Sequence, residues 1–82
     1  MAGPVLLDIK ITKYLNFTII GDTGKTLKIG VGNNAGVKLG IIKWVGGWHR
    51  YCFFPMEDMQ FDAGCLVDIV DYINELMAAR KS

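Results

Sequence analysis

A change in hydrophobic period near residue 61 divides this 82-residue chain into two unequal parts. Before it, apolar residues alternate with polar ones, which is the pattern of strands that bury one face. After it, apolar residues recur three and four positions apart, which is the pattern of an amphipathic helix. One helix cannot bury a wide apolar stripe alone, so the stripe must lie across a sheet or pair with a second copy. The sequence therefore predicts an α+β domain, with about five antiparallel strands followed by one C-terminal helix.

The strands are expected within residues 5–54 of a single domain that covers residues 1–82. Glycine-rich and polar turn segments separate the strand-like runs. The clearest pair is a hairpin predicted over residues 38–54, with Gly46 and Gly47 as a two-residue turn. On this register one face of the hairpin supplies four core residues: Leu39, Ile41, Cys52 and Phe54.

The predicted helix covers about residues 62–80 and begins after Asp62, which suits an N-cap. Its apolar stripe has six members: Leu66, Ile69, Val70, Ile73, Leu76 and Met77. Because 51% of the residues are apolar, so small a domain cannot bury all of them, and some face a partner. The simplest partner is a second copy. We predict a homodimer whose interface includes three of these residues: Ile69, Ile73 and Met77.

Two glycine-rich stretches resemble nucleotide-binding motifs without meeting their requirements. Residues 19–26, IIGDTGKT, end like a P-loop, but a P-loop needs glycine where Ile19 stands and a helix directly afterwards. Strand-like alternation follows instead, so we predict a hairpin turn that leaves Lys25 exposed to solvent. Residues 30–36, GVGNNAG, lack the helix that follows a dinucleotide fingerprint, and we predict a loop there.

The predicted hairpin carries the strongest chemical signal in the sequence. A two-glycine turn places Lys43 opposite Arg50, and like charges across a ladder are unfavourable unless an anion lies between them. The same register sets three further pairs opposite each other: Ile42 and Tyr51, Trp44 and His49, Val45 and Trp48. Cations interleaved with flat rings are typical of surfaces that bind single-stranded nucleic acid. We predict such a site, formed by six residues: Lys43, Trp44, Trp48, His49, Arg50 and Tyr51.

Two structural alternatives for these residues remain open. Trp44 and Tyr51 could equally pack under the helix, as half-buried aromatic side chains often do. Lys43 and Arg50 could each pair with an acidic residue from residues 56–59, which would leave no anion site.

The sequence offers no convergent acid–base pair, and we predict a protein without enzymatic activity, metal or cofactor. His49 is the only histidine, and a stacking or solvated role is expected for it. Cys65 could have a lowered pKa near the start of the helix, although burial is its more ordinary fate. Reduced thiols are expected at Cys52 and Cys65, since no secretory signal is recognisable.

Charge and hydropathy limit the possible partners further. Nine Lys and Arg against eight Asp and Glu give a net charge of +1, which excludes the strongly basic class of duplex-DNA binders. No apolar stretch approaches the ~20 residues that span a bilayer, so no membrane partner is predicted. We expect a cytoplasmic protein.

Residues 39–77 contain four distinctive motifs: Ile42-Lys43-Trp44, Trp48 with Tyr51-Cys52-Phe53-Phe54-Pro55, Phe61-Asp62 with Cys65-Leu66, and Asp68-Ile69. On these motifs the chain resembles a group of small, mostly uncharacterised proteins of tailed bacteriophages and prophages. The resemblance implies a phage protein acting in a bacterial cytoplasm, and it implies no established activity. The order of strands and helix also looks like that of transcription-coactivator-type and whirly-type single-stranded DNA binders, which dimerise partly through the helix.

These observations together predict a small non-enzymatic phage accessory protein, a homodimer that binds single-stranded nucleic acid through the hairpin. The alternative is an interaction module that docks on a host protein through the same aromatic residues. A third hypothesis is a protein that sequesters a signalling nucleotide at a dimer interface.

Overall fold

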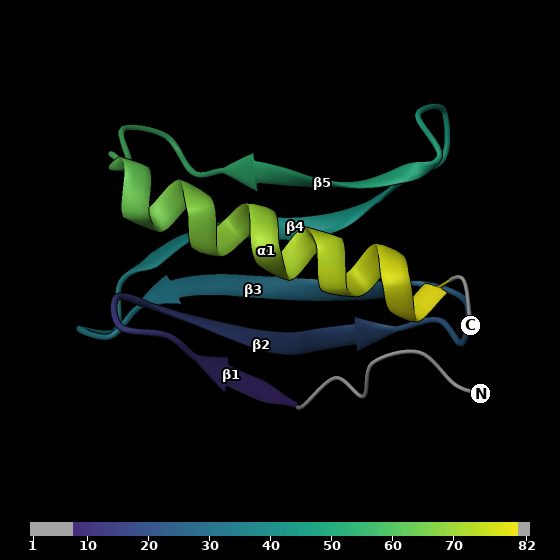
Figure 1. Cartoon of the computed structure of the whole chain (residues 1–82), viewed down its shortest axis with the longest axis horizontal. Coiled ribbons are helices and arrows are strands. Elements are labelled where there is room, and N and C mark those ends of the chain that lie inside the picture. The colour runs from purple at the N-terminus through teal and green to yellow at the C-terminus, as the bar shows by residue number, and fades with distance from the viewer. Residues whose placement is uncertain (1–7, 81–82) are drawn as a thin grey trace.

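The computed structural model describes residues 8–80, in which five strands are followed by one helix (Figure 1). The elements are β1 (Ile9–Ile11), β2 (Leu15–Asp22), β3 (Leu27–Asn33), β4 (Lys38–Val45), β5 (Arg50–Pro55) and α1 (Ala63–Arg80). The predicted α+β class is confirmed. Residues 5–7 of the first predicted strand lie outside the described residues.

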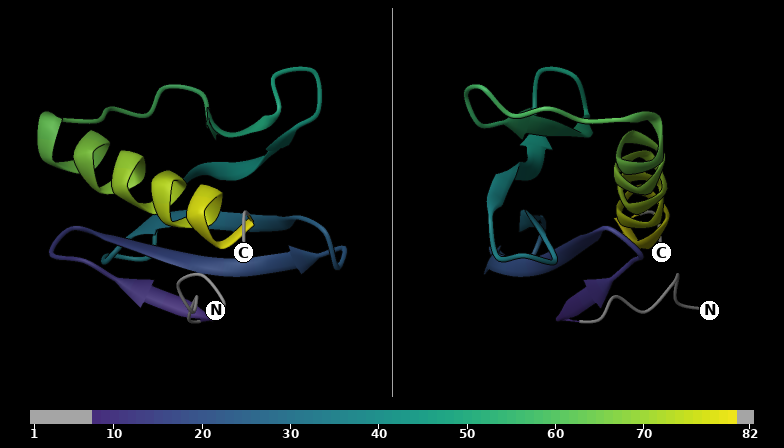
Figure 2. Two further views of the ribbon diagram at one scale, coloured as in Figure 1. Left: turned by 45° about the vertical axis from the view of Figure 1, so that its right-hand side comes forward. Right: turned by 90° about the vertical axis from the view of Figure 1, so that its left-hand side faces the viewer.

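The five strands form a meander in which each strand pairs antiparallel with the next. Figures 1 and 2 show α1 lying across one face of this sheet and leaving the opposite face uncovered. Bulges interrupt the alternation of side chains at Ile20 in β2 and at Leu39 in β4. In the text below, the two sides of the sheet are called the covered face and the uncovered face.

The core lies between α1 and the covered face. Ten apolar residues are buried there: Leu15, Phe17, Ile29, Val31, Leu39, Ile42, Tyr51, Ile69, Tyr72 and Leu76. Phe17 and Tyr72 stack with ring centroids 4.4 Å apart and an interplanar angle of 6°. The hydroxyl of Tyr72 has no hydrogen-bond partner among residues 8–80. Its burial, with a smaller effect from the charge of Glu75, raises the pKa of Tyr72 to about 12.

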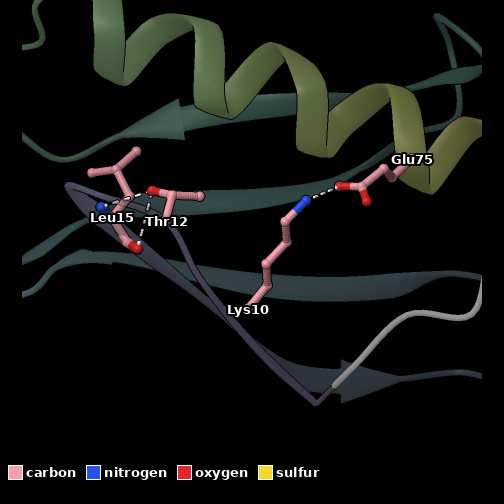
Figure 3. Close-up of polar contacts among 4 residues, drawn as sticks. All are labelled: Lys10, Thr12, Leu15 and Glu75. Atoms are coloured by element: carbon pink, nitrogen blue, oxygen red, sulfur yellow. Dashed lines mark hydrogen bonds and ion pairs between the residues drawn. The ribbon is translucent and has the colours of Figure 1, made fainter.

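An ion pair connects the edge strand β1 to the helix. The Nζ atom of Lys10 lies 2.6 Å from Oε2 of Glu75 (Figure 3). Both side chains are more than one-third exposed, so the pair contributes only about 0–1 kcal/mol. In the adjoining turn, the Thr12 hydroxyl accepts from the Leu15 amide at 3.0 Å and donates to the Leu15 carbonyl at 3.3 Å (Figure 3). The ion pair therefore aligns β1 with α1 more than it stabilises the fold.

The helix begins where the sequence predicts. The carboxylate of Asp62 accepts a hydrogen bond from the Cys65 amide at 2.9 Å, which satisfies one free amide of the first turn and lowers the pKa of Asp62. Among the described residues, α1 falls short of the combination of length and apolarity needed to cross a bilayer.

The apolar stripe of α1 is divided between the core and the solvent. Ile69 is only 3% exposed and packs against the sheet, so its predicted place in a dimer interface is wrong. Ile73 and Met77 are half-buried and pack at the margin of the core. Three other apolar side chains of the helix are about half exposed: Leu66, Val67 and Val70.

The helix covers one face of the β4–β5 hairpin, and the face predicted as core is the other one. Phe54 is 41% exposed, and Ile41 and Cys52 are half-buried on the uncovered face, so their assignment to the core is wrong. Leu39 is the one of the four that is buried, because the bulge at this residue breaks the alternation. Both faces of the hairpin are rich in apolar residues, so alternation alone does not identify the covered one.

The turn over residues 22–26 has hairpin chemistry and does not form a phosphate-binding loop. The Asp22 carboxylate accepts the Gly24 amide at 2.7 Å, and Gly24 adopts a φ of +86° that favours glycine. Strand β3 starts at Leu27, so no helix N-terminus follows Lys25. The predicted hairpin turn is confirmed.

Candidate nucleic-acid interface

Four residues, 46–49, connect β4 to β5, so the predicted two-glycine turn is wrong. A two-residue type I′ turn needs positive φ at both central positions, and neither glycine adopts it. Instead, the Trp48 amide donates to the Val45 carbonyl at 3.1 Å and the His49 amide to the Gly46 carbonyl at 3.3 Å. His49 takes the left-handed conformation, with a φ of 53°. The register of the hairpin therefore shifts by two residues from the prediction.

The shifted register removes the predicted pair of opposed cations. Lys43 lies opposite Cys52 and not opposite Arg50. Its Nζ atom lies 4.7 Å from the centroid of the Phe54 ring, on the uncovered face. Neither cation forms a salt bridge within residues 8–80, so the alternative pairing with residues 56–59 is not found either.

Tyr51 belongs to the core. Its side chain is 5% exposed, and its hydroxyl accepts a hydrogen bond from the Leu27 amide at 3.0 Å. Trp44 is half-buried and packs edge-on against it, with centroids 5.3 Å apart. The predicted stacking role of Tyr51 is therefore wrong, because no base can reach a buried ring.

Trp44 also contacts a cation from the far end of the chain. The guanidinium carbon of Arg80 lies 3.9 Å from the centroid of the Trp44 ring. The same guanidinium donates a hydrogen bond to the Lys25 carbonyl at 2.9 Å. These contacts join the 22–26 turn, β4 and the last turn of α1. Figure 1 shows the turn between β2 and β3, the last turn of α1 and the hairpin loop at the same end of the molecule.

An open depression of about 590 Å³ lies between these segments. Its lining includes Lys25, Trp44, His49 and Arg80. Trp48 in the hairpin loop is 68% exposed, and its carbonyl accepts a hydrogen bond from Nε of Arg50 at 3.2 Å. We call six residues the corner site: Lys25, Trp44, Trp48, His49, Arg50 and Arg80.

Positive charge is concentrated at the corner site. Lys25 and Arg80 line the same depression, Arg50 follows the hairpin loop at the start of β5, and the nearby Asp22 carboxylate accepts a hydrogen bond from the Gly24 amide. Four acidic residues lie just before α1 or in its first turns: Glu57, Asp58, Asp62 and Asp68. The 18 residues of α1 span about 27 Å, so these four acidic residues lie far from Arg80 at the other end of the helix, with Asp71 and Glu75 between them. The near-neutral net charge of the chain therefore conceals a local positive patch.

Lys25 and Arg80 are absent from the site predicted from the sequence. Their contact spans 55 positions of the chain, and it depends on the strand order and the path of the helix. No local spacing signals such a contact. Conversely, Lys43 and Tyr51 are predicted members that the structure places elsewhere, on the uncovered face and in the core.

The two cysteines are free thiols. Burial, followed by the hydrogen bond and charge of Asp62, raises the pKa of Cys65, which is the opposite of activation by a helix N-terminus. Within residues 8–80 no three His, Cys, Asp or Glu side chains gather closely enough to hold a metal ion.

The chain is 43% identical to an uncharacterized 9.3 kDa protein of Acholeplasma phage L2 over 77 residues, which cover 92% of this chain and 99% of the phage protein. The similarity therefore extends well beyond residues 39–77. No protein-family model matches the chain, and no solved structure matches it. The likeness to coactivator-type and whirly-type DNA binders stays a prediction drawn from the order of the elements.

Proposed function

The chain belongs to the family of small phage proteins that includes the 9.3 kDa protein of Acholeplasma phage L2, and we propose that it is a non-enzymatic accessory protein that binds single-stranded nucleic acid at the corner site. The stack of Arg80 on Trp44 carries this proposal. It places a cation and a flat ring at one depression, with Lys25 and His49 in its lining and the exposed Trp48 nearby.

Each part of the corner site suits one part of a nucleic-acid strand. The Trp48 ring offers a free surface on which a base stacks, and such a contact contributes ~1–3 kcal/mol. Arginine planes stack with unpaired bases as well, which suits the Arg80 guanidinium. Lys25 and Arg50 are exposed and supply charge for phosphates. Stacking on a ring requires an accessible base face, which an intact duplex does not offer, so the fitting ligand is single-stranded.

The proposal includes a homodimer formed through α1. Leu66, Val67 and Val70 leave an apolar strip on the part of the helix that the sheet does not cover, with Ile73 and Met77 at its margin. A second copy placed on this strip would remove it from water. In such a dimer the two corner sites lie at the C-terminal ends of the paired helices.

The test measures how salt affects the affinity for a labelled oligothymidylate, using fluorescence anisotropy. Each phosphate contact on a single strand contributes about −0.7 to the slope of log affinity against log salt, so three cations predict a slope of about −2. Lys25→Gln and Arg50→Gln should each reduce this slope by about 0.7. Lys13→Gln is the matched control, since Lys13 is exposed in the turn between β1 and β2 and lies outside the corner site.

Four results would contradict this proposal. Absence of saturable binding at low salt would reject it, as would an equal loss of slope in the Lys13→Gln control. A mononucleotide that binds as tightly as the oligonucleotide would instead favour the nucleotide-sequestering hypothesis. If the protein binds no oligonucleotide but captures a host protein, and if this capture is insensitive to salt and lost when Trp48 is replaced, the docking module is favoured.

A further inference from the structure

Among the described strand positions, the uncovered face of the sheet carries positive charge without acidic residues. The strand registers place four cations there: Lys28, Lys38, Lys43 and Arg50. All four are exposed, and none of them forms a salt bridge within the described residues. The strand positions that share this face include no Asp or Glu. Unbalanced cations on one face favour an anionic partner.

A groove of about 680 Å³ runs along this face. Its floor is formed by Gly30 and Gly32 of β3, which place no side chain between the neighbouring strands. Ile20 stands on one side, while Ile41 and Phe54 stand on the other. Ile20 and Phe54 are 54% and 41% exposed, so the walls of the groove present apolar surface to the solvent.

The depression at the corner site lies on the covered face and the groove on the uncovered face, and cations at the hairpin end of β4 and β5 lie between them. Ile29 pairs with Ile42, so Lys28 and Lys43 lie at the same end of β3 and β4, toward the hairpin loop. Arg50 follows at the end of the hairpin, where it belongs both to the uncovered face and to the corner site. Lys38 lies at the opposite end of the groove, beside Gly32. Cations therefore mark a path from the corner site along the length of β3, which spans roughly 23 Å.

We infer that a single nucleic-acid strand bound at the corner site continues along this groove, with bases against its apolar walls and phosphates at Lys28, Lys43 and Lys38. This inference rests on the proposed function and adds the route and the length of the bound strand. A second copy of this chain fits the groove poorly, because a two-fold interface would set the four cations of one copy against those of the other. Single-stranded nucleic acid satisfies both features, since it brings phosphates and flat apolar bases together.

The test variant fills the floor of the groove. A methyl group at Gly30 would lie 3.4 Å from the Ile20 side chain, an ordinary contact, and Gly30 has no left-handed φ. The Cβ of Gly30→Val is therefore compatible with the strand, where a β-branched residue is favoured. The double variant Lys28→Gln/Lys43→Gln tests the same path by charge and leaves the floor unchanged. Gly64→Ala in α1, where a methyl group meets nothing closer than 3.6 Å, is the control.

Oligothymidylates of about 4 and about 16 nucleotides, the range of site sizes known for one OB fold, separate the corner site from the groove. Gly30→Val should weaken binding of the longer strand at least about 5-fold, the loss of one stacked base, and leave the shorter strand within about 2-fold. The lysine double variant should reduce the salt slope for the longer strand by about 1.4, and Gly64→Ala should change neither quantity.

Failure of the inference and failure of the proposed function give different results. If both variants bind the longer strand like the unmodified protein, with the same salt slope, the groove is not the route and the corner site stands alone. If neither oligonucleotide binds the unmodified protein, both proposals are refuted. Gly30→Val could instead abolish binding of polyglutamate and leave the affinity for oligonucleotide unchanged. In that case the groove binds an acidic protein segment and the inference is wrong.

Discussion

Trp48 allows the sharpest test of nucleic-acid stacking, because its ring is 68% exposed. The backbone of this residue donates a hydrogen bond from its amide to the Val45 carbonyl and accepts one at its carbonyl from the Arg50 side chain, and both hydrogen bonds survive replacement by alanine. Trp48→Ala should therefore change the free energy of unfolding by less than about 0.5 kcal/mol. Loss of a stacked base costs about 1–3 kcal/mol, so the dissociation constant for oligothymidylate should rise about 5- to 150-fold.

Fluorescence anisotropy of a labelled oligothymidylate, repeated over a range of salt, gives two independent readouts for this variant. The affinity should fall while the slope against salt stays unchanged, because the indole ring carries no charge. Trp48→Phe should restore most of the affinity. Ile11→Ala is the control, since Ile11 is 70% exposed on β1, away from the corner site. An affinity within about 2-fold of the unmodified protein in Trp48→Ala would refute stacking at this ring.

Three further predictions concern stability and assembly. Gly40→Ala should lower the free energy of unfolding by about 1–3 kcal/mol, because the new methyl group would lie 2.5 Å from the Phe54 carbonyl oxygen. Each kcal/mol lowers the midpoint of thermal unfolding by about 4–8 °C, and an unchanged midpoint would contradict this prediction. Tyr72→Phe should stabilise the protein by about 1 kcal/mol at neutral pH, since it removes a buried hydroxyl without a partner. The raised pKa of Tyr72 means that the unfolded chain ionises at a lower pH than the folded protein does. The free energy of unfolding of the unmodified protein should therefore be unaffected by this group below pH ~10 and should fall between pH ~10 and about 12, by up to roughly 2.7 kcal/mol. Denaturant titrations in which the unmodified protein and Tyr72→Phe lose stability in parallel over this range would exclude this effect. Val70→Asp should shift the protein toward monomer in analytical ultracentrifugation, and an unchanged distribution would exclude the α1 interface.

The amino-acid sequence by itself determines the fold class, the cap at the start of α1 and the turn between β2 and β3. The change of period near residue 61 marks the passage from sheet to helix, because burial of one face imposes a period of two on strands and 3.6 on helices. The Asp62 carboxylate caps α1. The hydrogen bond between Asp22 and Gly24 closes a hairpin turn in the segment that resembles a P-loop. These features depend on neighbours within a few residues, so the sequence contains all the information that they need.

Only the tertiary structure decides the hairpin register, the covered face and the membership of the corner site. Two glycines permit a two-residue turn but do not require one, and the observed register buries Tyr51 with its hydroxyl bonded to the Leu27 amide. The covered face is set by where α1 docks, since apolar residues occupy both faces of the hairpin. Arg80 meets both Trp44 and the Lys25 carbonyl because the strand order and the length of α1 bring these segments together. Contacts of this kind depend on three-dimensional distance, which hydrophobic periodicity does not encode.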